Sequence, residues 1–156
     1  MKTWHRILAV IIVAIIGIAA GLNKLAEGER NKGVNVRSVS NLHQIGIALL
    51  MYSDDNNNVL PDLSDAQSLK KATASYLNIR DEKVKVFVHP KTGKPYQPNS
   101  SLSGKDGKGT NIANAVVVYE DEPAEDGTRA VLFGDAHVER VNEAKWLELK
   151  KTSHIP

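Results

Sequence analysis

The sequence lacks cysteine altogether, and aromatic residues make up only 5% of its 156 positions. Without cysteine, disulfides, thiolate metal sites and cysteine nucleophiles are excluded. The net charge is only +2, which gives no general attraction for nucleic acid. The small excess comes from the first 40 residues, where six Lys or Arg face two Glu, whereas the rest of the chain has fourteen bases and sixteen acids. The globular part is therefore slightly acidic.

The common motifs of catalytic and phosphate-binding sites are also missing. The T-G-K at 92–94 lacks the spacing of a phosphate-binding loop, and no Ser-His-Asp order or paired-carboxylate motif stands out. Asp135 and His137 flank a turn, with His89 as a distant third candidate ligand, but D-A-H matches no metal-ligand motif. The acidic loop 120–126 lacks the arrangement of a calcium loop, so we expect a solvated hairpin loop there. We therefore expect no catalytic residue, cofactor or metal site.

What the sequence does contain is one long apolar run, residues 7–22, without a charge. A helix of this length covers about 24 Å at ~1.5 Å per residue, whereas a bilayer core needs about 30 Å, so flanking Arg6 and Lys24 would have to reach outward to the headgroups. Two interpretations follow. In a retained membrane helix, Gly17 and Gly21 form a G-x-x-x-G spacing that lets two helices approach closely. In a signal peptide, the small residues offer a cleavage site after Gly21.

The apolar run divides the chain. If the run is retained as a membrane helix, we expect a short cytoplasmic leader at 1–6, a transmembrane helix at 7–23, a helical stem or hinge at 24–40 and a globular domain at 41–156. Positive residues before the run place the N-terminus in the cytoplasm and the domain on the other side of the membrane. Length allows one domain of roughly 110 to 130 residues.

The start of that domain, residues 41–52, has the period of an amphipathic helix laid on an apolar surface. Its packing residues share one stripe, formed by Leu42, Ile45, Leu49 and Tyr52. Gly46 on the same side would allow a strand to approach closely. The Asp and Asn residues at 54–58 end the helix, because Asx side chains favour turns.

The central part of the chain predicts few regular elements. Ser64 and Gln67 form a capping-box signature, which opens a helix to about Leu77. The alternating V-K-V-F-V at 84–88 predicts a strand. Residues 91–114 are rich in Gly, Pro, Ser and Lys and predict a long solvated loop.

The last part predicts a small antiparallel meander followed by a helix. Its three strands are expected at 115–119, 129–133 and 136–141, with Gly134 supplying a positive-φ turn position. Asn142 then caps a terminal helix at 143–150. The packing residues of that helix are expected to be Trp146, Leu147 and Leu149. The fold class predicted from all elements is α+β.

Three stretches of this sequence, in this order, resemble one family. They are SNLHQIGIALLMYSDDNNNVLPD at 40–62, FVHPKTGKPYQPNSSLSG at 87–104 and RAVLFGDAHVERV at 129–141. With the apolar N-terminal helix, they resemble type II secretion pseudopilin-like proteins, in particular the planctomycete and verrucomicrobia-type group. That group carries S-N-L-x-Q-I-G-x-A-L, then F-x-C-P, then a closing L-F-A-D-G-H-V-E hairpin.

The chain departs from the family pattern at three places. No Gly precedes the apolar run and no Glu lies within it, although prepilin cleavage and filament assembly in the family use both. His89 stands where the family usually has Cys. The D-G-H turn is D-A-H here, with its glycine at Gly134. The helix is therefore expected to act as a membrane anchor, and a role in filament formation rests only on analogy with the family.

The resemblance implies a pilin-like fold, in which a long N-terminal helix packs on a small antiparallel sheet. It implies a noncatalytic, single-pass subunit of the bacterial inner membrane, with its domain on the periplasmic or extracytoplasmic side. The implied partners are the membrane and other pilin-like or secretion-system subunits, with no nucleic acid, small-molecule substrate or cofactor. The alternative is a secreted or periplasmic binding domain released by signal peptidase, and an enzyme that uses Asp135 and His137 is the third hypothesis.

Overall fold

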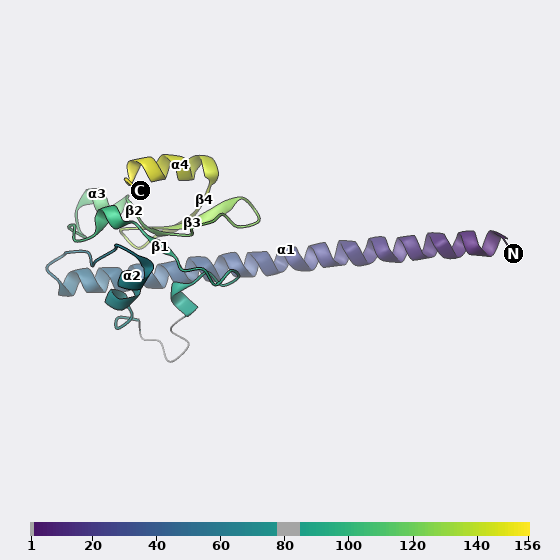
Figure 1. The fold of residues 1–156 in the computed structure, drawn as a ribbon, viewed down its shortest axis with the longest axis horizontal. Coiled ribbons are helices and arrows are strands. Elements are labelled where there is room, and N and C mark those ends of the chain that lie inside the picture. Colours follow the sequence, from purple (N-terminus) through teal and green to yellow (C-terminus); the bar gives the residue numbers. More distant parts are fainter. Residues whose placement is uncertain (1, 78–84) are drawn as a thin grey trace. The chain divides into compact units, whose positions relative to one another are not determined.

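A computed structural model describes residues 2–77 and 85–156, with side chains described at 16–77, 85–109 and 111–156. The chain divides into two units, Met1–Val34 and Asn35–Pro156. The α+β class expected from the sequence is confirmed, since one long helix and three shorter ones accompany a four-stranded antiparallel sheet (Figure 1).

The first unit is entirely helical in its described part and belongs to α1, which runs over Lys2–Asp55. The segment 24–40 is helical throughout, despite its two glycines. Apolar side chains here are exposed, with Ile18 at 64% and Leu25 at 70%. Among the residues whose side chains the structure describes, no helix is long and apolar enough to cross a membrane. Residues 7–15 of the expected span are not among those residues.

The second unit contains the sheet. Its strands form an antiparallel meander in the order β1-β2-β3-β4. They span Gln97–Pro98 (β1), Val116–Tyr119 (β2), Thr128–Phe133 (β3) and Val138–Asn142 (β4). The register of β2 against β3 shifts between Val116 and Val118, which is the mark of a β-bulge. The three strands expected at 115–119, 129–133 and 136–141 therefore all form, with boundaries shifted by one or two residues.

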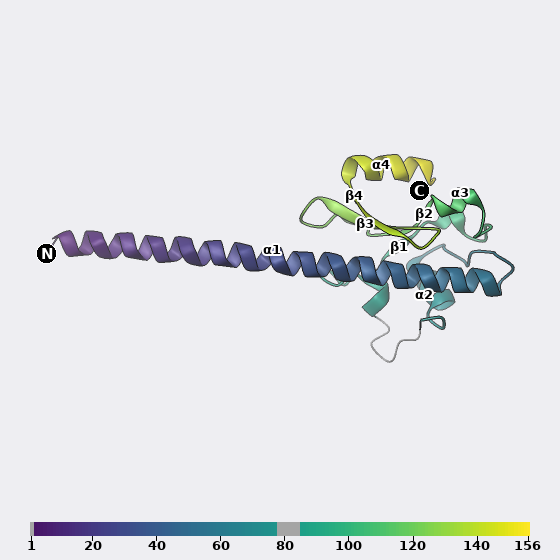
Figure 2. The same cartoon turned by 180° about the vertical axis from the view of Figure 1, so that it is seen from behind.

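Each face of the sheet has its own apolar core. Alternate residues of β3 point to opposite faces, so Ala130 and Leu132 join one cluster while Val131 and Phe133 join the other. The first cluster contains the helix residues Leu42, Ile45, Ala48 and Leu49, all buried. The second cluster is covered by α4, Glu143–Thr152 (Figures 1 and 2).

The stripe expected on α1 meets the sheet over most of its length. Leu42, Ile45 and Leu49 belong to the same cluster as the strand residues, whereas Tyr52 is half-buried. The Tyr52 ring packs edge-on against Tyr76, with ring centroids 6.1 Å apart. Tyr52 therefore contacts the segment after α2 (Ala66–Thr73).

Gly46 allows the close approach that the sequence predicted. A Cβ at this position would lie 2.7 Å from Leu132 Cδ1 and 2.9 Å from Ala136 Cβ. Both distances are shorter than carbon atoms tolerate without rearrangement. The absence of a side chain at Gly46 thus sets how closely α1 lies on β3.

Two local expectations in the central part were wrong. Asp65, not Ser64, caps α2 by accepting a hydrogen bond from the Ser68 N–H at 2.7 Å, and α2 ends at Thr73. The expected strand at 84–88 is a 3-10 turn at 85–87 followed by an isolated bridge; position 84 lies outside the described residues. Val86 and Phe87 are both buried, and a 3-10 turn can bury neighbouring residues that a strand would point to opposite faces.

The expected long loop at 91–114 was largely wrong. It contains β1, a 3-10 helix at Ser100–Leu102 and α3 at Thr110–Ala113. Tyr96 is 1% exposed and Asn99 is fully buried. The Asn99 side-chain amide donates to the carbonyls of Val116 (3.0 Å) and Ser153 (2.8 Å). Asn99 therefore ties the chain after α4 to β2, which local sequence pattern does not reveal.

The turn between β3 and β4 also differs from the expectation in which residue has positive φ. Ala136, not Gly134, adopts positive φ, at 70°. Gly134 is required for a different reason, since a Cβ there would lie 2.2 Å from the Ile112 carbonyl oxygen.

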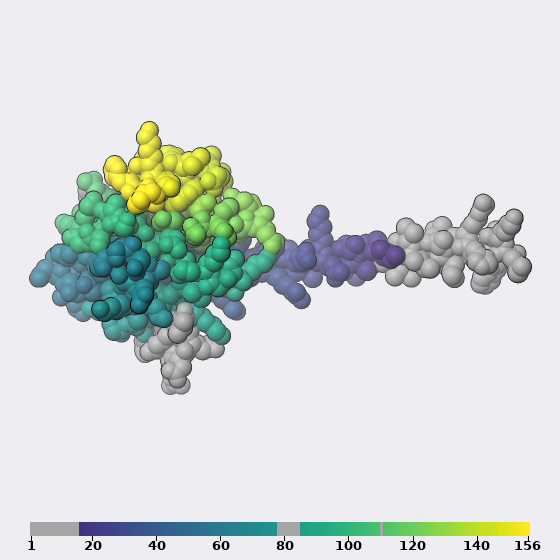
Figure 3. All heavy atoms as spheres, viewed as in Figure 1, coloured from purple at the N-terminus to yellow at the C-terminus, as the bar shows by residue number. Residues whose placement is uncertain are grey.

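The C-terminal helix follows the expectation at its start. Asn142 accepts the Lys145 N–H at 2.9 Å and caps α4. Trp146 and Leu149 are buried, but Leu147 is 60% exposed and does not pack. The space-filling view shows the C-terminal segment, in yellow, lying against the segments drawn in green (Figure 3).

Candidate functional site

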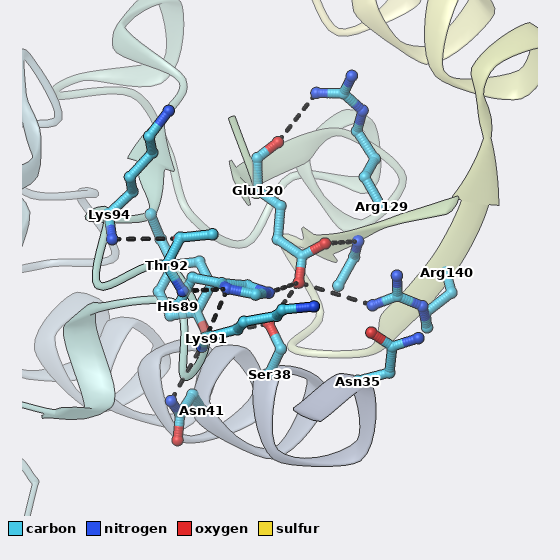
Figure 4. Close-up of polar contacts among 12 residues, drawn as sticks. Asn35, Ser38, Asn41, His89, Lys91, Thr92, Lys94, Glu120, Arg129 and Arg140 are labelled. Atoms are coloured by element: carbon cyan, nitrogen blue, oxygen red, sulfur yellow. Dashed lines mark hydrogen bonds and ion pairs between the residues drawn. The ribbon is translucent and has the colours of Figure 1, made fainter. Parts of the chain in front are cut away.

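The most distinctive chemical feature of the described chain is a buried carboxylate, that of Glu120, directly after β2. Only 3% of Glu120 is exposed. Its Oε2 accepts the backbone N–H of Ala130 at 2.8 Å, and its Oε1 accepts the Ser38 hydroxyl at 2.5 Å (Figure 4). The carboxylate thus joins α1 to β3.

Two cationic or potentially cationic groups face the same oxygen. Arg140 Nη1 on β4 and His89 Nε2 each lie 3.6 Å from Glu120 Oε1. Arg140 is itself held by Thr128, whose Oγ1 and carbonyl oxygen each accept a hydrogen bond at 2.9 Å. Arg140 therefore balances the buried charge of Glu120 from a fixed position, which offsets much of the cost of removing that charge from water.

His89 has a defined tautomer in this arrangement. Its Nδ1 lies 3.3 Å from the backbone nitrogens of Lys91 and Thr92, and both N–H groups donate to it. An acceptor nitrogen carries no proton, so the neutral ring has its proton on Nε2, which faces Glu120. Burial lowers the pKa of His89 below 6.5; Glu120 raises it, and Arg140 and Lys91 lower it further.

Tyr96 and Asn41 complete the cluster on the side of α1. The Tyr96 hydroxyl is 2.9 Å from Ser38 Oγ and 3.5 Å from Asn41 Nδ2. Since Ser38 donates to Glu120, Tyr96 donates to Ser38, which gives a continuous chain of hydrogen bonds into the carboxylate. Burial raises the pKa of Tyr96, so its hydroxyl keeps its proton. We call the set Ser38, Asn41, His89, Tyr96, Glu120 and Arg140 the Glu120 cluster.

A second arginine links the end of β2 to α4. Arg129 is buried, and its Nη1 donates to the carbonyls of Glu120 (3.0 Å) and Asp121 (2.7 Å). Its guanidinium lies 4.5 Å from the centre of the Trp146 ring, and Nη2 pairs with Glu143 at 3.2 Å. Arg129 therefore fixes the chain on the far face of the sheet, where α4 packs.

The acidic loop 120–126 is held largely by ion pairs. Glu122 pairs with Lys94 at 2.6 Å, and Glu125 pairs with Lys91. The hydrogen bond from Lys94 lowers the pKa of Glu122, and the same bond raises the pKa of Lys94. Glu120 points into the protein. These contacts engage three of the carboxylates that a calcium ion would need, and no group of three potential metal ligands occurs among the described residues.

Asp135 and His137 do meet, but without His89. The His137 Nδ1 lies 2.5 Å from Asp135 Oδ1, and both side chains are about half exposed. The His137 ring stacks on Phe133, with centroids 4.2 Å apart and planes within 5°. Burial acts to raise the pKa of Asp135, but hydrogen bonds from His137 outweigh it and the pKa is lowered. His89 lies instead in the Glu120 cluster, so the three candidate ligands are not brought together.

His43, on α1, also has a structural partner. Its Nδ1 lies 2.9 Å from the carbonyl oxygen of Ala136, in the turn between β3 and β4. His43 is an exposed residue of its helix. The contact nevertheless ties α1 to this turn beside Gly46.

Sequence reasoning missed the Glu120 cluster, although part of it left a signal. Ser38 and Asn41 fall on the same helical stripe as Leu42, Ile45 and Leu49 and are therefore polar residues on a buried face. Such residues need partners. Nothing local to Glu120 or Tyr96 identifies them as those partners, since they follow 82 and 58 residues after Ser38.

Comparison with known proteins adds no assignment: no family model, no curated protein and no solved structure significantly matches the chain.

Proposed function

We propose that this protein is a noncatalytic, membrane-anchored, pseudopilin-like subunit, structural or accessory, of a type II secretion or type IV pilus-like system. Its fold would be pilin-like, with residues 7–23 in the bacterial inner membrane and the domain on the periplasmic or extracytoplasmic side. The single observation that carries the proposal is the continuity of α1. One helix, Lys2–Asp55, carries both the apolar run and the stripe that lies against a four-stranded antiparallel sheet.

The polar chemistry of the domain supports a noncatalytic role. Ser38 bonds to both Glu120 and Tyr96, and Glu120 is almost inaccessible. A catalytic carboxylate must reach a substrate in a cleft, whereas this one fastens a helix to a sheet. The proposal includes no cofactor, nucleic acid or small-molecule substrate.

The proposed partners are the membrane and other pilin-like or secretion-system subunits. Leu22 and Leu25 are 61% and 70% exposed, and a Cβ at Gly17 or Gly21 would meet nothing within 4 Å in the single chain. Small residues at this spacing suit close packing between helices. Such packing would be supplied by another subunit.

Fractionation with N-terminal sequencing tests the proposal. We expect the native protein in the membrane fraction, resistant to extraction by alkaline carbonate, with residues 7–22 retained. The control is the same analysis of a variant with Ala19→Arg and Ile12→Arg, which should not be retained, because arginine at the centre of a span costs about 2.5–3.5 kcal/mol. A mature protein that begins at Leu22 and is soluble would overturn the anchor and favour the secreted binding domain.

A further inference from the structure

The Glu120 cluster is covered on one side by a short turn that begins at His89. The His89 N–H donates to the Lys94 carbonyl at 2.8 Å, and the Gly93 N–H donates to the His89 carbonyl at 2.9 Å. Gly93 has φ of 69°, which glycine adopts without strain. We call residues 89–94 the His89 turn.

Side-chain atoms of His89 and Thr92 hold the inside of the His89 turn, and Thr92 Oγ1 accepts the Lys94 N–H at 3.3 Å. His89 Nδ1 accepts the N–H groups of both Lys91 and Thr92, each at 3.3 Å, and the His89 side chain is 13% exposed. On the outside, Lys91 and Lys94 pair with Glu125 and Glu122 of the acidic loop. The turn therefore contacts both the Glu120 cluster, as Figure 4 shows, and the acidic loop.

We propose that His89 is a pH-sensitive latch, whose protonation at Nδ1 opens the His89 turn and releases its hold on Glu120 and on the acidic loop. The reason is the hydrogen-bond inventory of the ring. A neutral imidazole has one acceptor nitrogen, whereas the imidazolium has none. A proton on Nδ1 would face two N–H donors, so at least two hydrogen bonds are lost.

The charges around His89 decide which state the fold favours. Glu120, at the end of β2, attracts an imidazolium, whereas Arg140 on β4 and Lys91 in the turn repel it. The residues contributed by α1, Ser38 and Asn41, are uncharged, and the hydroxyl of Tyr96 keeps its proton. Because Arg140 already balances the charge of Glu120, the attraction of Glu120 for an imidazolium at His89 is smaller than the free-energy cost of burying that charge.

The direction of the pH dependence follows. Because the pKa of His89 in the closed turn is lower than its ordinary value of 6.5, the open turn binds the proton more tightly. Closure is therefore complete above that ordinary value and is lost progressively as the pH falls through the lowered pKa.

Amide hydrogen exchange in the full chain tests the latch. After correction for intrinsic exchange, protection of the Lys91 and Thr92 amides is expected to fall between about pH 7.5 and about pH 5, by at most about tenfold per pH unit for one linked proton. In His89→Asn the loss should disappear, because the Asn Oδ1 accepts N–H groups two and three residues on and does not titrate. His154→Asn, which removes an exposed histidine of positive φ, should keep the wild-type dependence.

Imidazole nitrogen NMR on the wild type gives a second measurement that needs no variant. The His89 ring is expected to carry its proton on Nε2 at neutral pH and to titrate below 6.5. A proton on Nδ1 at neutral pH, a midpoint above 6.5, or protection that is absent or independent of pH would each overturn the latch. An equal pH dependence in His89→Asn would overturn it as well.

Discussion

At the scale of single residues, Glu120 matters because its carboxylate is buried and bonds to both α1 and β3. Its two oxygens hold a hydroxyl of α1 and a backbone N–H of β3, and Arg140 lies beside it. A buried ion pair is weak evidence for stability as such, but breaking one is expensive, because the remaining charge stays buried without a partner. Glu120 is therefore the residue at which a single substitution should do most harm.

We expect Glu120→Ala to lower the free energy of unfolding by about 3–5 kcal/mol, because Arg140 and the Ala130 N–H lose their partner inside the protein. Urea unfolding of the full chain in detergent measures this. The matched control is Glu122→Ala, which also removes a paired carboxylate two residues away but an exposed one, and should change stability by less than about 1 kcal/mol. Equal effects of the two substitutions would refute the structural role of the cluster.

The same cluster shows what residue-level sequence reasoning can and cannot do. Ser38 and Asn41 are conspicuous in the sequence, since they occupy a helical stripe that is otherwise apolar. Their partners are not, because Tyr96 lies in a stretch rich in Pro and Gly, and Glu120 heads an acidic loop. The composition of these two stretches predicts side chains exposed to solvent, whereas tertiary contacts bury Tyr96 and Glu120. The same holds for Asn99, which is fully buried within the segment expected to be a loop.

At the scale of elements, the contact between α1 and the sheet depends on the absence of one side chain. Gly46 lies against Leu132 and Ala136 at distances that leave no room for a methyl group. By contrast, a Cβ at Gly33, on the same helix, would meet nothing within 4 Å. Although both glycines lie within α1, a side chain is excluded by packing at Gly46 and is not excluded at Gly33.

We expect Gly46→Ala to destabilise the protein by about 1–3 kcal/mol, because the added methyl group must push α1 away from β3 or displace Leu132. Gly33→Ala should instead raise stability, by up to about 1 kcal/mol, since alanine favours a helix over glycine. Thermal unfolding of both variants under one condition gives the comparison. The packing described for α1 is wrong if Gly46→Ala stabilises the protein as much as Gly33→Ala does.

The elements that the sequence predicted correctly are those with local causes. The α1 stripe follows from a 3.6-residue period, and the Asn142 cap of α4 from one side chain and the N–H three residues on. The prediction of a strand at 84–88 was wrong, because alternation of apolar and polar residues over only five positions is a weak signal. In the structure, Val86 and Phe87 are both buried within a 3-10 turn.

At the scale of the whole molecule, the described core belongs to one unit. Both apolar clusters, the Glu120 cluster and the sheet lie within Asn35–Pro156. The described residues before Asn35 form helix alone. The chain therefore separates into a part that buries an apolar core and a part whose described apolar side chains are exposed.

We expect residues 35–156 alone to be soluble and to unfold cooperatively, because they contain all the described members of both clusters. Circular dichroism with urea titration checks this. A matched truncation to 56–156, which removes Leu42, Ile45 and Leu49 from the first cluster, should not fold. If the longer fragment is unfolded, or if the shorter one folds equally well, α1 is not the structural centre of this domain.

The sequence by itself determined the apolar run at 7–22, the helical stripe after it, the three-strand meander and the α+β class. Each of these depends on periodicity or turn chemistry within about twenty residues, which a single segment carries in its own composition. Only the tertiary structure decided that Glu120, Ser38 and His89 meet, that Asn99 holds the C-terminal segment, and that Gly46 and Gly134 serve close approach. Those outcomes depend on residues far apart in the chain, where burial and hydrogen bonding are set by what the fold brings next to them.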